Sequence, residues 1–201
     1  MLATRVNRAR AQTTIRALLL LSALLVAGGC GAALGPIEHW ALDQGGVVRD
    51  AQEQGRAELA LARLKPLPTH RLSVAVLASE SPGAYCWPSG QVFVTRGLVD
   101  LADDDELAAA IAHEVGHLLV DGHLPPPAAL DGRRGSSRHA PCADAELSAD
   151  LAARQLLSAS AVSSAALPRL LDKIARHAAT TPSRRADLER RIARLAADER
   201  P

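Results

Sequence analysis

Aromatic residues and lysine are scarce in this chain. Its 201 residues include one Phe, one Tyr and two Trp, and Lys occurs only as Lys65 and Lys173, so the positive charge comes almost entirely from arginine. We attribute the arginine bias and the abundance of alanine to genome composition rather than to a binding signal. The formal net charge is only +1 at pH 7. This balance gives no reason to propose a nucleic acid as a partner.

Apolar runs long enough to cross a membrane are also lacking. The apolar stretch 17–27 is too short to span a bilayer comfortably, and four arginines precede it, so residues 1–30 are predicted to be an export signal. Two glycines directly before Cys30 are typical of a bacterial lipoprotein processing site, although Ala27 stands where a large aliphatic residue is usual. A plain secretory signal and an uncleaved signal anchor are the alternatives. We expect a lipid-anchored protein of the bacterial cell envelope that faces the periplasm. By resemblance to other bacterial lipoproteins, Gly31 in place of Asp after the cysteine favours the outer membrane.

The remaining residues, 31–201, are predicted to form a single α+β domain that is mainly helical. With 48% hydrophobic and 22% charged residues the chain can bury one core, and its sequence contains no internal repeat. Periodicity and turn residues predict helices at 36–64 (interrupted at Gly45 and Gly46), 143–157, 167–177 and 184–197, and strands at 72–77 and 91–95.

The segment His113-Glu114-Val115-Gly116-His117 carries the strongest chemical signal. Residues four apart on a helix lie one turn apart on the same face, so His113 and His117 can present their imidazole nitrogens to one ion. Glu114 lies beside them, where it can take a proton from the attacking water. The alternative is a pair of surface histidines beside an ordinary glutamate.

The sequence around this motif predicts a helix. Asp103 and Glu106 have the spacing of a capping box, and Asp121-Gly122 ends the pattern. Between them, apolar residues recur at helical spacing, namely Leu107, Ile111, Val115 and Leu118. We therefore predict that the motif lies on an amphipathic helix.

A second acidic pair follows at a distance that can complete a zinc site. Glu146 and Asp150 are one helical turn apart, so Glu146 can be the third ligand while Asp150 accepts the free ring N–H of a ligating histidine. Three protein ligands leave a position open for water, which is the catalytic arrangement, whereas a structural zinc normally has four protein ligands. The alternative is a solvated helix face, because acidic helix faces are common.

These motifs resemble the zinc endopeptidases related to HtpX and the CAAX prenyl protease, and most closely their small periplasmic lipoprotein members. The resemblance rests on the order and spacing of the segments 90–98, 105–112, 113–117 and 146–150. It covers about residues 70–157 and implies a gluzincin-type fold, in which the edge strand of a small β-sheet lies beside the metal helix. It also implies one zinc ion per chain.

The chain departs from this family at two places. Gly83-Ala84 stands where the family often has Asn-Ala ahead of the edge strand, and Thr181-Pro182 stands where it has His-Pro. The arginine that follows in the family has four candidates here, which are Arg184, Arg185, Arg190 and Arg191. A substrate-binding or oxyanion role at these positions therefore stays open.

From these features we expect a zinc-dependent endopeptidase that cleaves unfolded or extended envelope proteins in protein quality control. The strand at 91–95 is predicted to pair with extended substrate through backbone hydrogen bonds. Two alternatives keep the metal without cleavage: an assembly factor that uses zinc to hold a partner, and a metal-storing lipoprotein. Glu114 argues against the first because a binding site needs no base, and the second requires a richer His or carboxylate cluster.

Two further groups of residues border the predicted site. Tyr85, Trp87 and Phe93 gather just ahead of the metal helix and form either a cleft wall or a small core cluster. If the N-terminal cysteine carries lipid, Cys86 and Cys142 remain as an even pair in an oxidising compartment and can form a disulfide. Two separate buried thiols are the alternative.

Residues 124–142 show no periodicity and contain three consecutive prolines and a glycine-rich run, so we predict a mobile loop. The loop ends shortly before Glu146. We expect it to act as a lid, in which His139 enters the open coordination position and keeps the enzyme latent. A solvent-exposed linker with an idle His139 is the alternative.

Overall fold

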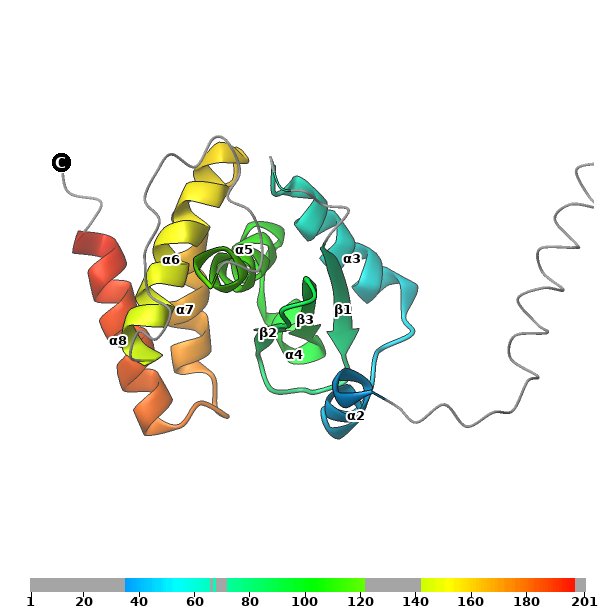
Figure 1. Cartoon of the computed structure of the whole chain (residues 1–201). Helices are drawn as coiled ribbons and strands as arrows, with labels where there is room; N and C mark the ends of the chain where they lie inside the picture. Colours follow the sequence, from blue (N-terminus) through cyan, green and yellow to red (C-terminus); the bar gives the residue numbers. More distant parts are fainter. Residues whose placement is uncertain (1–34, 66, 68–71, 122–141, 198–201) are drawn as a thin grey trace, which may run out of the picture. The chain divides into compact units, whose positions relative to one another are not determined.

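The computed structural model describes residues 35–65, 67, 72–121 and 142–197 (Figure 1). The chain divides into two compact units, Met1–Glu38 and His39–Pro201, and the sheet and the site described below belong to the second. Helix α2 (Pro36–Asp43) begins in the first unit and continues into the second. The predicted lipidation site Cys30 and the predicted lid with His139 lie outside the described residues.

The described elements agree with the predicted mainly helical α+β class. They are α3 (Ala51–Arg63), β1 (Ser73–Leu77), β2 (Ala84–Cys86), β3 (Gln91–Thr95), α4 (Arg96–Leu101), α5 (Asp104–Val120), α6 (Cys142–Ala159), α7 (Ala166–Arg176) and α8 (Pro182–Ala197). The predicted helices and strands lie within two residues of these bounds, except that the helix predicted to resume after Gly46 begins only at Ala51. The sequence patterns missed the two shortest elements, β2 and α4, because three and six residues are too few to show a period.

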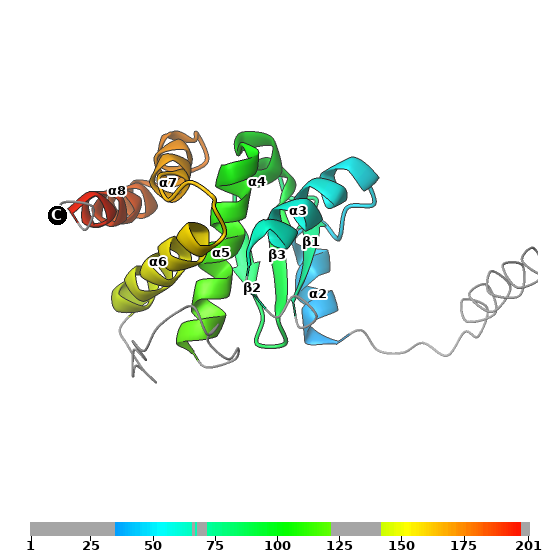
Figure 2. The same cartoon turned by 90° about the horizontal axis from the view of Figure 1, so that it is seen from above.

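Helix α5, which carries the histidine motif, lies in the middle of this unit (Figures 1 and 2). The sheet and α3 pack on one side of it, and α6 and α7 pack on the other. As a result every residue from Glu106 to Gly116 is buried. The prediction of an amphipathic helix is wrong in this respect, because the small side chains of Ala108, Ala109, Ala110 and Ala112 let neighbouring elements approach from several sides.

The start of α5 is fixed as the sequence predicts. Asp103 accepts a hydrogen bond from the Glu106 amide, and Glu106 accepts one from the Asp103 amide, both at 2.8 Å, so the capping box is confirmed. The buried Glu106 carboxylate also accepts a hydrogen bond of 2.6 Å from Lys173 of α7. This contact ties α7 to the first turn of the metal helix.

The sheet has the order β1-β3-β2, with β1 parallel and β2 antiparallel to the central strand β3. Val92, Phe93 and Val94 of β3 each have a partner residue on both sides. The prediction that this strand pairs with substrate is therefore wrong, because its neighbours within the sheet already occupy both of its sides.

The two outer edges of the sheet differ. On the outer side of β1, Gln54 donates to the Val74 carbonyl at 2.8 Å, and the Val48 amide donates to the Val76 carbonyl at 2.8 Å. The outer side of β2 has no neighbouring strand among the described residues. Strand β2 is thus the open edge of the sheet, and it contacts α5.

Candidate metal centre

Three side chains from two helices converge at the centre of this unit. His113 and His117 come from α5 and Glu146 comes from α6. The Nε2 atom of His113 lies 3.2 Å from one carboxylate oxygen of Glu146, and the Nε2 atom of His117 lies 3.3 Å from the other. One donor atom from each residue fits within a span of 4.8 Å.

This donor set fits a zinc ion. Two ring nitrogens and one carboxylate oxygen are the ligand types of catalytic zinc, and the ligands of a tetrahedral zinc at about 2.0–2.1 Å stand roughly 3.3 Å from one another. The distances from Glu146 to the two histidines match this spacing. Among the described residues this is the one cluster of three metal-ligating side chains.

A glycine between the two histidines sets how closely the helices approach. A Cβ atom on Gly116 would lie 2.6 Å from the backbone oxygen of Ala149 on α6. Any side chain at this position would therefore push α6 away from α5. The missing side chain lets Glu146, one turn before Ala149, reach the histidines.

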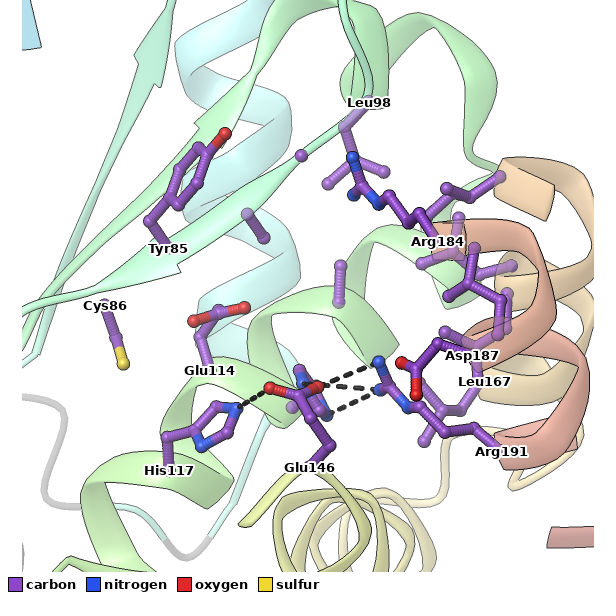
Figure 3. A pocket seen from close by; sticks show the side chains of 18 of the residues that line it. Tyr85, Cys86, Leu98, Glu114, His117, Glu146, Leu167, Arg184, Asp187 and Arg191 are labelled. Carbon is purple, nitrogen blue, oxygen red and sulfur yellow. Dashed lines mark hydrogen bonds and ion pairs between the residues drawn. The ribbon is translucent and has the colours of Figure 1, made fainter. Parts of the chain in front are cut away.

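Asp150 and Arg191 contact the predicted metal ligands and fix their orientation. The Nδ1 atom of His113 lies 2.9 Å from Oδ1 of Asp150, a carboxylate with no exposed surface. Arg191 of α8 donates to both oxygens of Asp150, at 2.8 and 2.6 Å. The Nη1 atom of Arg191 also lies 2.9 Å from Glu146, and Figure 3 shows these two side chains next to each other. Because Asp150 occupies Nδ1 of His113, the Nε2 atom of that ring is the one that faces Glu146.

These contacts shift the pKa values of the cluster. Burial alone would lower the pKa of His113, but its hydrogen bonds to Asp150 and Glu146 outweigh burial and raise the pKa to about 9. Burial would raise the pKa of Glu146, but hydrogen bonds from His113 and His117 hold it well below its usual range. Glu146 is therefore ionised, as a metal ligand must be.

Glu114 lies next to this cluster and is not part of it. Its side chain is almost completely buried and lines the same cavity as the histidines. Burial raises its pKa above the ordinary range of a glutamate, which brings a carboxylate closer to the range suited to a general base. On its β2 side lies the thiol of Cys86, whose pKa is raised by burial and by the neighbouring Glu114.

The cluster opens into a cavity of about 530 Å³. One wall is strand β2 and the residues that flank it, and the opposite wall is formed by apolar residues of α7. Arg184 and Arg191 of α8 also line the cavity. A cavity of this volume is within the range of ligand-binding pockets in proteins, and the predicted metal ligands form part of its lining.

The structure distinguishes the four arginines that the sequence leaves open. Arg191 contacts Asp150 and Glu146. Arg184 reaches the Pro82 carbonyl at 3.4 Å, at the entrance to β2. The other two lie away from the metal cluster, since Arg185 donates to the Ala175 carbonyl and Arg190 pairs with Asp187.

Some predicted features are not settled by the structure. Cys86 carries a free thiol, and the side chain of Cys142 lies outside the described residues, so a disulfide between them stays a prediction. The same holds for the roles of His139 and Cys30. Trp40 also borders the cavity and was not predicted from the sequence, because its position on a separate helix gave no signal of its proximity to the metal motif.

Comparison with known proteins agrees with this geometry. Residues 50–124 match the model of peptidase family M48. No curated protein matches the chain. The family match supports a gluzincin-type metallopeptidase and includes His113, Glu114 and His117. It ends before α6, so the placement of Glu146, Asp150 and Arg191 beside the histidines comes from the structure alone.

Proposed function

We propose that this chain is a zinc-dependent endopeptidase that hydrolyses peptide bonds of unfolded or extended proteins in the bacterial cell envelope. The observation that carries the proposal is the pairing of a three-donor metal cluster with a separate buried carboxylate, Glu114, in one cavity. A site that only binds metal or holds a partner has no need of that carboxylate.

Each residue of the cluster has a defined task in this reaction. His113, His117 and Glu146 would hold a zinc ion, which would supply the Lewis acidity that polarises the scissile carbonyl and makes water more acidic. Glu114 takes the proton of the attacking water and returns it to the leaving amine. Asp150 keeps the ring of His113 in the orientation that leaves Nε2 free.

Strand β2 supports the choice of extended substrates. The Thr95 amide donates to the Gly83 carbonyl, and the Trp87 amide donates to the Gln91 carbonyl. Backbone groups alternate in direction along an antiparallel strand, so the N–H and C=O groups of Ala84 and Cys86 point away from β3, to the side of the open edge. A peptide can add to this edge by backbone hydrogen bonds only if it is extended, which excludes the interior of a folded protein.

The second candidate is a zinc-binding envelope lipoprotein that acts as an assembly factor without cleavage. The open β2 edge is the feature that favours it, because a strand can be bound there without being cut. Metal storage has less support, since the described residues contain one cluster of three ligands and no richer group.

The two candidates are separated by replacing the base. In Glu114→Gln we expect zinc content to equal that of the wild type, and casein cleavage to fall at least about 100-fold, because general acid–base catalysis contributes about 10²- to 10⁴-fold. Zinc content is measured by atomic absorption on the same samples. Glu189→Gln, the same change at an exposed position of α8, is the control and should leave both unchanged.

Three results decide the question. Full cleavage by Glu114→Gln would remove the base from the mechanism. If Glu114→Gln lost both its zinc and its cleavage activity, Glu114 would be needed for the structure of the site rather than as a base. A wild type that is loaded with zinc and cleaves neither casein nor peptides would favour the assembly factor.

A further inference from the structure

All four aromatic residues of the chain form one cluster beside the metal centre. The ring centroid of Trp40 lies 5.1 Å from Tyr85, 5.1 Å from Trp87 and 5.2 Å from Phe93. These are ordinary spacings for edge-to-face and tilted aromatic pairs. Trp40, Tyr85 and Trp87 also line the cavity that contains the metal ligands.

The register of the sheet places three of these rings, those of Tyr85, Trp87 and Phe93, on one face. Tyr85 pairs directly with Phe93, so their side chains lie on the same face of the sheet. Trp87 follows Tyr85 by two residues, so its side chain lies on that face as well. Ala84 and Cys86 project to the opposite face, where Cys86 lies beside Glu114. Figure 3 shows Tyr85 directed away from Cys86 and from the metal ligands.

Strand β2 therefore borders the cavity with two different faces. Glu114 and the metal ligands lie on the α5 side of the strand, and Tyr85 and Trp87 lie on its other side together with Trp40. A peptide that adds to the open edge of this strand directs successive side chains to opposite faces of the sheet. A substrate side chain that lies opposite Tyr85 must then project beside Tyr85, Trp40 and Trp87, while its two neighbours face Glu114.

We propose that Trp40, Tyr85 and Trp87 form a subsite for one large apolar side chain of the substrate, preferably aromatic, at the position opposite Tyr85. The proposal rests on the peptidase function above and adds its specificity. Phe93 is 3% exposed and supports the rings from below, whereas Tyr85 is 38% exposed and Trp40 and Trp87 are partly exposed. An apolar residue placed here covers aromatic surface that is otherwise in water, whereas a polar residue at this position finds among these rings only the Tyr85 hydroxyl and the two indole N–H groups as partners.

The two tryptophans of the chain, Trp40 and Trp87, both belong to this subsite, so tryptophan fluorescence reports on it directly. The probes are capped octapeptides of Ala and Ser that carry a single Phe, moved along the sequence, each with its Phe→Ala counterpart. Binding is measured with the full-length Glu114→Gln variant, which holds the peptide without cutting it. We expect the best Phe peptide to change the fluorescence and to bind about tenfold more tightly than its Ala counterpart.

Variants test whether the rings cause this preference. Trp40→Ala should reduce the ratio of Phe to Ala affinity to about one, while Trp40→Phe should keep most of it because a ring remains. Cleavage by the zinc-loaded protein gives the second measurement, in which Trp40→Ala should lower kcat/KM for the Phe peptide and leave that for the Ala peptide unchanged. Leu59→Ala is the control, since Leu59 is 69% exposed on α3 and does not line the cavity.

The outcomes separate this proposal from the peptidase function. Equal binding of Phe and Ala peptides to the parent protein, or unchanged discrimination in Trp40→Ala, overturns the subsite. Absence of cleavage with Trp40-dependent peptide binding intact would overturn the peptidase function and leave the subsite in place. Trp40-dependent binding to phosphatidylglycerol vesicles without any peptide discrimination would make these rings a membrane contact, which also overturns the proposal.

Discussion

At the scale of single residues, Asp150 controls how the metal cluster is oriented. It is fully buried, it contacts His113 at 2.9 Å, and both of its oxygens accept hydrogen bonds from Arg191. Burial would raise its pKa, but the hydrogen bonds from Arg191 and His113 hold the pKa below its usual range and keep it ionised. Its negative charge also offsets the positive charge that Arg191 brings close to the ligands.

We predict that Asp150→Ala lowers the zinc affinity about 10- to 100-fold, because His113 loses the partner that fixes its ring. The measurement is competition with a coloured chelator for zinc in the purified protein. Asp172→Ala is the matched control, since Asp172 pairs with Arg176 on α7 through a contact in which both side chains are well exposed. An affinity equal to that of the wild type in Asp150→Ala would show that the ring of His113 is held without it.

The pairing of Asp150 with a histidine could be predicted from the sequence, but the role of Arg191 could not. Glu146 and Asp150 lie one turn apart on one helix, so their common direction follows from helix geometry. Arg191 lies 41 residues after Asp150 on another helix, next to three other candidate arginines. Which of the four arginines points inward depends on the rotation of α8 about its own axis. The helical period of the sequence alone does not determine that rotation.

At the scale of secondary-structure elements, the contact between α5 and α6 decides whether the third ligand reaches the histidines. Gly116 has no room for a Cβ atom because the backbone of Ala149 fills that space. Glycine within a helix costs about 0.5–1 kcal/mol relative to alanine. The glycine at position 116 has this cost, but it allows α5 and α6, which carry the metal ligands, to approach each other closely.

We predict that Gly116→Ala lowers the free energy of unfolding, because overpacking by one methyl group costs about 1–3 kcal/mol and outweighs the gain in helix propensity. It should also weaken zinc binding, since α6 carries Glu146. Urea unfolding and chelator competition measure the two effects.

The control for this prediction is Gly55→Ala on α3. A Cβ atom there meets nothing within 4 Å, so the same substitution should stabilise the protein by about 0.5–1 kcal/mol. If Gly116→Ala stabilised the protein as much as Gly55→Ala, the approach of α5 and α6 would not depend on the glycine.

At the scale of the whole molecule, the N-terminal segment is proposed to attach the peptidase to a membrane. Among the described residues, no helix has both the length and the apolar character required to cross a bilayer. If Cys30 carries lipid, the six residue steps from Cys30 to Pro36 span at most about 22 Å, at 3.3–3.6 Å per residue. The helix that carries Trp40 would then start close to the membrane surface.

We predict that the mature protein starts at a lipidated Cys30 and fractionates with membranes, whereas Cys30→Ser is released or remains unprocessed. Mass spectrometry of the mature N-terminus gives the cleavage site and the added lipid. Cys86→Ser, which removes a cysteine that lines the cavity, is the control for general effects of thiol loss on fractionation. Cleavage at another position with an unmodified Cys30 would show a secreted protein in place of a lipoprotein.

The sequence by itself determined the local part of this protein. The positions of most helices and strands, the capping box of α5 and the common face of His113 and His117 all follow from spacings within a few residues, which backbone geometry fixes. The tertiary structure alone decided the central place of β3, the open edge at β2, the inward position of Arg191 and the gathering of four aromatic rings around Trp40. These features join residues far apart in the chain, and their proximity depends on how the elements pack around α5, where small residues such as Gly116 set the distances.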